Sequence, residues 1–182
     1  MSQPAPQPLA RVPQGGAWSP APQGLPGAPG PLDDDMVPVL AALGPGVPFA
    51  LATLVARDGG PRPVGAQMVI TRERRWGLLS GGCVEGDVAA HALAALDDGA
   101  SRTLTYGRGS PFFDIRLPCG GRIDLLVEPV GPGDASVARL LDLAARRRPA
   151  RYLSDGRRRR CLEAGEEGGE GTGGPWVVDR LA

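Results

Sequence analysis

The stretch FALATLV, from Phe49 to Val55, decides the fold. Only Thr53 interrupts its apolar residues, and a turn sequence, Asp58-Gly59-Gly60-Pro61, follows it. A short apolar run of this kind is typical of a strand that is covered on both faces. We therefore expect this strand inside a sheet that has packing layers on both sides.

Strand and helix patterns alternate along the rest of the chain. Further strands are expected over 67–71, 76–80, 103–106 and 123–128, and helices over 33–43, 85–96 and 134–148. In the middle helix, Val88, Ala92 and Ala95 share one face, and Asp97-Asp98-Gly99 closes it. The alternation predicts the α/β class, with a mixed sheet and packed helices in a single domain.

The sequence divides into three parts. Residues 1–31 are rich in Pro, Gly, Gln and Ala. They predict a flexible leader, because such a segment buries too little apolar area to offset the entropy of ordering it. Residues 32–162 form the expected domain, which ends in a hairpin over 151–162 around Asp155-Gly156. Residues 163–182 are expected as a Gly- and Glu-rich loop followed by a short strand at 176–179.

Composition restricts the classes of function. The 182 residues carry no net charge at pH 7, whereas a nucleic-acid binder would show a surplus of basic charge. No apolar run approaches the ~20 residues that a membrane-spanning helix needs. The three cysteines, Cys83, Cys119 and Cys161, are too few and too scattered for a disulfide framework. We expect a reducing, cytoplasmic location.

Two glycine-cysteine segments carry the chemistry. The first glycine loop, Ser80–Gly86, reads SGGCVEG and lies between an expected strand and an expected helix. Gly81 and Gly82 allow a tight turn and a close backbone approach to a ligand. The N–H groups and dipole of the helix start can hold an anion, and Cys83 lies at this positive end, which favours a thiolate.

The second glycine loop, Leu117–Gly121, reads LPCGG and precedes an expected strand. It again pairs a cysteine, Cys119, with two glycines, Gly120 and Gly121. If both loops come to the same edge of the sheet, two soft sulfur ligands lie beside an anion-binding cradle. Soft thiolates suit a thiophilic metal centre or a sulfur atom that is passed on.

A purely structural interpretation stays open beside this one. Gly-Gly pairs are common in turns, and free cysteine is often buried and inert. No Gly-x-Gly-x-x-Gly or Walker motif is present, and zinc is poorly supported without a Cys-x-x-Cys pair.

Single polar residues near the loops have two interpretations as well. Glu85 and Asp87 fit stabilisation of the helix start, with ligand contact as the alternative. Arg62, held between two prolines, points either to an anionic group or to solvent. The only histidine, His91, fits a packing or surface role.

The motifs together resemble the XdhC/CoxI family of accessory proteins for xanthine-dehydrogenase-type enzymes. The resemblance rests on PRPVGAQM at 61–68, the two glycine loops and Val127-Glu128-Pro129, in that order. It covers about residues 33–162. Full-length members usually carry a second, dinucleotide-binding-type domain, and we expect that domain to be absent here.

The resemblance implies a chaperone that is not itself an enzyme and that holds the molybdenum cofactor, in its molybdopterin form, as cargo. It implies that Cys83 and Cys119 face the molybdenum or its sulfur, while the glycine backbones of both loops approach the pterin phosphate. The implied partners are a molybdenum hydroxylase apo-enzyme and a cysteine desulfurase that supports sulfuration. A homodimer is a further, separate expectation. Two alternatives stay open: a thiol-based sulfurtransferase or oxidoreductase using Cys83, and a truncated docking remnant that binds no cofactor.

Overall fold

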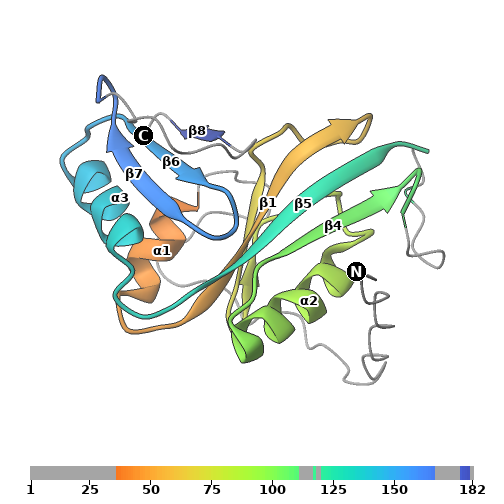
Figure 1. Ribbon diagram of the computed structural model, residues 1–182, viewed down its shortest axis with the longest axis horizontal. Coiled ribbons are helices and arrows are strands. Elements are labelled where there is room, and N and C mark those ends of the chain that lie inside the picture. The colour runs from red at the N-terminus through yellow and green to blue at the C-terminus, as the bar shows by residue number, and fades with distance from the viewer. Residues whose placement is uncertain (1–35, 111–116, 118–119, 167–176, 181–182) are drawn as a thin grey trace, which may run out of the picture.

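The computed structural model describes residues 36–110, 117, 120–166 and 177–180. In this part of the chain, eight strands form two sheets and three helices pack against them (Figure 1). Sheet A has the order β3-β2-β1-β5-β4, with β1 at Phe49–Asp58, β2 at Gln67–Ile70, β3 at Arg75–Trp76, β4 at Arg102–Gly107 and β5 at Arg122–Val130. Sheet B has the order β7-β6-β8, with β6 at Ala150–Ser154, β7 at Arg159–Glu163 and β8 at Val177–Arg180. The helices are α1 at Val37–Leu43, α2 at Glu85–Asp98 and α3 at Ala135–Ala145.

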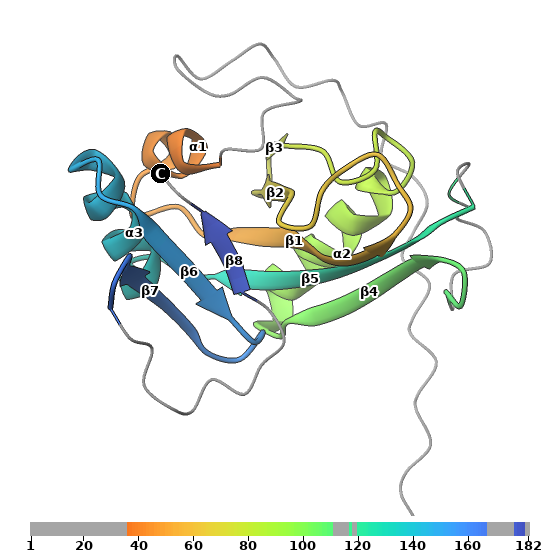
Figure 2. The same cartoon turned by 90° about the horizontal axis from the view of Figure 1, so that it is seen from above.

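Strand β1 lies at the centre of sheet A and separates two hydrophobic cores. Ala50, Ala52 and Leu54 face the core beneath α2. Phe49 and Leu51, which alternate with them, face the core formed with α1, α3 and sheet B. Figures 1 and 2 show these layers on the two sides of the strand. The expectation of a strand buried on both faces is confirmed.

The α/β class is also confirmed, but the strands are arranged differently from a mixed sheet. All strand pairs that the structure describes are antiparallel, and they fall into two sheets. The longest pairing joins β1 to β5, from Phe49 opposite Val130 to Asp58 opposite Arg122. Because these strands are far apart in sequence, periodicity within each strand carries no information on their pairing.

The prediction of a third strand over 76–80 is wrong beyond Trp76. Gly77 has φ 93°, and a Cβ there would lie 2.2 Å from the carbonyl oxygen of Gln67. The chain therefore turns at this glycine and leaves the sheet. Leu79 and Ser80 continue as a loop whose N–H groups bind a side chain instead of a strand.

The other expected elements are present, with ends that move by a few residues. Gly99 closes α2 in the left-handed conformation, at φ 71°. Asp134 caps α3, accepting hydrogen bonds from the N–H groups of Ser136 and Val137 at 3.0 Å each. The hairpin around Asp155-Gly156 forms as β6 and β7. The first three residues of the helix expected over 33–43 lie outside the described residues.

No helix in the described part of the chain has the length and apolar character needed to cross a membrane.

Candidate functional site

The first glycine loop connects β3 to α2 and presents its glycines outward. Gly81 and Gly82 have φ angles of 89° and 113°, which side-chain-bearing residues rarely adopt. A Cβ added at either position would meet nothing within 4 Å. Cys83 follows as an exposed, free thiol. The loop thus offers open backbone and one accessible sulfur to a ligand.

Glu85 holds this loop from behind. Its side chain is buried, and one oxygen accepts hydrogen bonds from the N–H groups of Leu79 at 2.9 Å and Ser80 at 2.7 Å. The other oxygen accepts from the Ser80 hydroxyl at 2.9 Å and the Val84 N–H at 3.1 Å. Both carboxylate oxygens are therefore engaged within the loop, which supports a bracing role for Glu85.

The surroundings of Glu85 favour its charged form. Burial by itself would raise the pKa of this carboxyl. The backbone N–H groups of Ser80, Leu79 and Glu85, together with the Ser80 hydroxyl, outweigh burial and hold the pKa below its ordinary value. The loop is consequently built around a buried negative charge.

This arrangement changes the expected anion cradle. The Ser80 hydroxyl oxygen accepts hydrogen bonds from the N–H groups of Cys83 at 3.0 Å and Val84 at 3.2 Å. With Leu79 and Ser80 bound to Glu85, much of the N–H set at the helix start is already satisfied. The open backbone for a ligand is therefore at Gly81 and Gly82. The sequence showed Ser80 and Glu85 in one motif but gave no sign that they bind each other.

The second glycine loop lies at the start of β5. Gly120 is exposed, with φ 67°, and its N–H donates to the Leu117 carbonyl at 2.9 Å. Gly121 is buried, and its carbonyl accepts from the N–H of Arg108 at 3.2 Å. Cys119 lies outside the described residues. In the described part of the chain, no three His, Cys, Asp or Glu side chains gather closely enough to hold a metal ion.

Both loops lie at the same end of sheet A. Tyr106, near the end of β4, donates its hydroxyl to Asp87 in the first turn of α2 at 2.6 Å. The next residue, Gly107, lies so close to the second loop that a Cβ there would be 1.9 Å from the Gly121 carbonyl oxygen. Leu117 shares one hydrophobic core with Leu79, Val84 and Tyr106. The structure thus brings together the described parts of the two loops.

The β1–β2 turn lies at this end as well. A Cβ at Gly59 would lie 3.5 Å from the Cα of Gly121, and Asp58 forms an ion pair with Arg108. Half-buried Arg62 lies in the same turn, where its carbonyl accepts from the Arg57 guanidinium at 3.1 Å. The turn that carries Arg62 therefore lies beside the second loop, and the Asp58–Arg108 ion pair links the two.

A chain of polar side chains crosses from β4 to α2. The Asp87 oxygen that accepts from Tyr106 lies 3.6 Å from Nε2 of His91, one helical turn further along. Burial of His91, which is stronger than the opposing effect of Asp87, lowers its pKa, and Arg102 adds to this effect. Burial, followed by the hydrogen bond to Asp87 and the nearby carboxylates, raises the pKa of Tyr106. The i, i+4 spacing of Asp87 and His91 is visible in the sequence, whereas the contact with Tyr106 is not.

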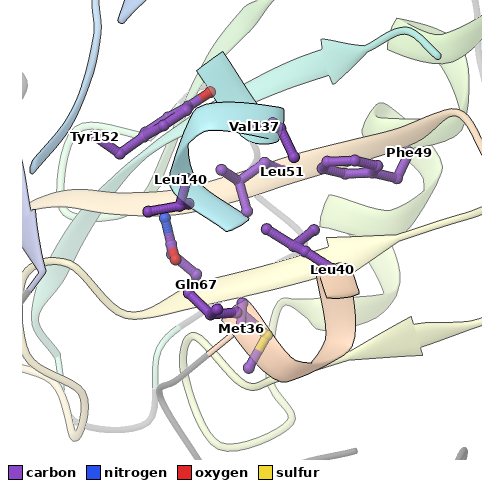
Figure 3. A pocket seen from close by; sticks show the side chains of 9 residues that line it. Met36, Leu40, Phe49, Leu51, Gln67, Val137, Leu140 and Tyr152 are labelled. Atoms are coloured by element: carbon purple, nitrogen blue, oxygen red, sulfur yellow. The ribbon is translucent and has the colours of Figure 1, made fainter. Parts of the chain in front are cut away.

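A small cavity lies on the other side of sheet A, between α1, α3 and strands β1 and β2 (Figure 3). Its lining is almost wholly apolar, with Phe49, Leu51, Leu140 and the amide of Gln67. Its volume of about 20 Å³ is roughly that of one water molecule. This cavity is too small for an organic cofactor.

Comparisons with known proteins bear on these loops. A family model described as the XdhC and CoxI family matches residues 42–107, which include the first glycine loop and end before the second. The chain is 44% identical over 108 residues to the molybdenum cofactor insertion chaperone PaoD of Escherichia coli K12. That alignment covers 58% of this chain and 34% of the relative, so the chain spans about a third of the curated relative's length. A solved chain described as a xanthine dehydrogenase from Bacillus halodurans superimposes with a TM-score of 0.54 at 28% identity, over 66% of this chain and 39% of that one.

Proposed function

We propose that the chain, whose residues 42–107 match the XdhC and CoxI family model, acts as a member of that family: it binds the molybdenum cofactor as cargo and assists its insertion into a molybdenum hydroxylase apo-enzyme. In this proposal the chain is a chaperone and turns over no substrate. The observation that carries it is the first glycine loop, where open glycine backbone and an exposed thiol are held in place by a buried carboxylate.

Each part of the candidate site has a role in this proposal. The backbones of Gly81-Gly82 and Gly120-Gly121 approach the pterin phosphate, because glycine leaves the space that a Cβ would occupy. Cys83 and Cys119 contact the molybdenum or its sulfur, since thiolates suit a thiophilic centre. Arg62 contributes positive charge near the phosphate. Glu85 acts through the shape of the loop, because both of its oxygens are already bonded.

We further propose that the chain supports sulfuration of the bound cofactor. An exposed thiol on a rigid loop can face the sulfur of the cargo while a cysteine desulfurase delivers it. The hydroxylase then receives the completed cofactor. The apo-enzyme partner is supported by the name of the relative, an insertion chaperone, whereas the cysteine desulfurase is proposed from the family resemblance alone.

A retention experiment tests the proposal. Molybdenum cofactor released from a molybdenum enzyme is mixed with the chain, excess is removed by gel filtration, and retained pterin is measured by fluorescence after oxidation. The native chain should retain pterin, and Cys83→Ala and Cys119→Ala should each retain less. Cys161→Ala is the control, because this cysteine is buried in the other core and should not affect retention.

Two results would contradict the proposal. Full retention by the double variant of Cys83 and Cys119 would remove the role of the thiolates. Absence of pterin from the native chain, together with a persulfide on Cys83 after incubation with a sulfur donor, would favour the sulfurtransferase alternative.

A further inference from the structure

Asp87 is an oriented carboxylate with one oxygen left open. Both of its close polar contacts, with the Tyr106 hydroxyl at 2.6 Å and with Nε2 of His91 at 3.6 Å, are made by the same oxygen, Oδ2. The other oxygen, Oδ1, contacts no polar group of the residues that the structure describes. The side chain is 27% exposed, so Asp87 is reachable from solvent.

The positions of its two neighbours fix the direction of this carboxylate. Tyr106 is fully buried in the core beneath α2, so its hydroxyl cannot move away from Asp87 without disturbing that core. His91 is largely buried one turn along the same helix. The buried Tyr106 hydroxyl requires an acceptor and takes Oδ2 of Asp87, which fixes the direction in which Oδ1 points.

Asp87 is connected to both glycine loops through its neighbours. It follows Glu85, which braces the first loop, by two residues. Its partner Tyr106 precedes Gly107, whose backbone is in contact with Gly121 of the second loop. Asp87 is therefore close, through Glu85 and Tyr106, to the described parts of both loops, where the proposed cargo binds.

Building on the proposed function, we propose that Asp87 recognises the 2-amino-4-oxopyrimidine edge of the pterin. That edge presents a ring N–H and an exocyclic amino group side by side, and a carboxylate is the matching acceptor. Tyr106 is the positioning residue that orients Asp87. The glycine loops and cysteines serve the phosphate and molybdenum end, so Asp87 supplies recognition of the organic ring that they lack.

Guanine carries the same edge, so the test must distinguish a pterin ligand from a guanine nucleotide. Saturation-transfer NMR on the full chain, at millimolar ligand, is recorded with pterin, with guanosine monophosphate, and with lumazine, which has an oxygen in place of the 2-amino group. The native chain should bind pterin about tenfold more tightly than lumazine, because the lost amino group leaves a carboxylate oxygen unpaired. Preference for pterin over guanosine monophosphate identifies the pterin as the ligand, and the reverse order would overturn that assignment.

Substitutions test whether the preference for pterin over lumazine depends on Asp87. Asp87→Asn should lose the preference for pterin over lumazine, because the amide can still accept from Tyr106 while its NH₂ replaces Oδ1 and repels N–H donors. Tyr106→Phe should weaken the preference by misorienting Asp87. Asp97→Asn, an exposed acid at the other end of α2 that pairs with Arg72, is the matched control and should change nothing.

Equal binding of pterin and lumazine by the native chain, or an unchanged preference in Asp87→Asn, would overturn the inference. Absence of any transfer to pterin would overturn it as well. The proposed function is judged separately, by cofactor retention in the Cys83 and Cys119 variants. Normal retention by Asp87→Asn with an unchanged ring preference would therefore leave the chaperone role intact.

Discussion

The buried carboxylate of Glu85 gives the sharpest prediction on the candidate site. Replacing it by glutamine keeps its size and leaves one oxygen to accept from the N–H groups of Leu79 and Ser80. The new NH₂ group takes the place of the oxygen that accepts from the Val84 N–H and the Ser80 hydroxyl. The hydroxyl can rotate, but the Val84 N–H then faces another donor.

The expected cost follows from these four contacts. A buried donor that loses its acceptor costs about 1–3 kcal/mol, and hydrogen bonds that lose an ionic partner weaken by about half. Together we expect Glu85→Gln to lower the free energy of unfolding by about 3 kcal/mol. For a chain of this size that corresponds to a fall in Tm of about 10 °C.

The pH dependence of this effect has a defined sign. The folded-state pKa of Glu85 lies below its ordinary value, so the carboxylate stabilises the fold above that ordinary value. This contribution is lost as the pH falls through the lower, folded-state pKa. The difference in stability between the native chain and Glu85→Gln should therefore be greatest near neutral pH and shrink in acid.

Denaturant unfolding measured from neutral to acidic pH checks both the size and the sign. Hydrogen exchange at the amides of Leu79, Ser80 and Val84 should accelerate in the variant, because the carboxylate is their acceptor. Glu73→Gln is the control: it removes an exposed carboxylate and should cost less than about 0.5 kcal/mol. Equal stabilities of Glu85→Gln and Glu73→Gln would refute the bracing role of Glu85.

Three further substitutions test how the fold is built. Gly77→Ala should destabilise the fold by about 2–4 kcal/mol in thermal unfolding, because its Cβ would lie 2.2 Å from the Gln67 carbonyl oxygen. The control Gly44→Ala has a similarly positive φ but open space around it, and should cost only about 1 kcal/mol. Equal costs of the two substitutions would contradict the close contact at Gly77. Burial raises the pKa of Glu128, so this group favours the fold below about pH 4.5 and loses that contribution as pH rises through the folded-state pKa. Glu128→Gln should therefore gain stability relative to the native chain between acidic and neutral pH, and a constant difference across that range would count against the shift. Asp134→Ala should cost about 1–2 kcal/mol in urea unfolding, because it removes the α3 cap and the 3.1 Å ion pair with Arg159. A cost equal to that of exposed Asp142→Ala would argue against this role of Asp134.

Local patterns were sufficient to predict most helices and strands. The apolar spacing of α2 and the glycine that follows it are contained in fifteen consecutive residues, Glu85 to Gly99. The hairpin of β6 and β7 follows from Asp155-Gly156, and Gly156 indeed has a positive φ of 81°. Each of these features depends on neighbours in sequence, so a single chain carries the information.

Features that depend on distant residues could not be predicted in this way. The pairing of β1 with β5 decides the order of sheet A, and nothing in either strand specifies the other. Gly77 ends β3 because the backbone of Gln67 is too close, although the local sequence continues a strand pattern. In the site, the glycines were found from the motif, but the link between Asp87 and Tyr106 joins a helix to a strand nineteen residues away.

The direct test of cargo binding at the first glycine loop is the alkylation rate of Cys83 with and without the molybdenum cofactor. In the free chain this exposed thiol should react readily with iodoacetamide, as followed by mass spectrometry. Stoichiometric cofactor should slow the reaction at Cys83 in the native chain, while pterin-free phosphate should not. Unchanged alkylation of Cys83 in a chain that has demonstrably bound the cofactor would contradict the account.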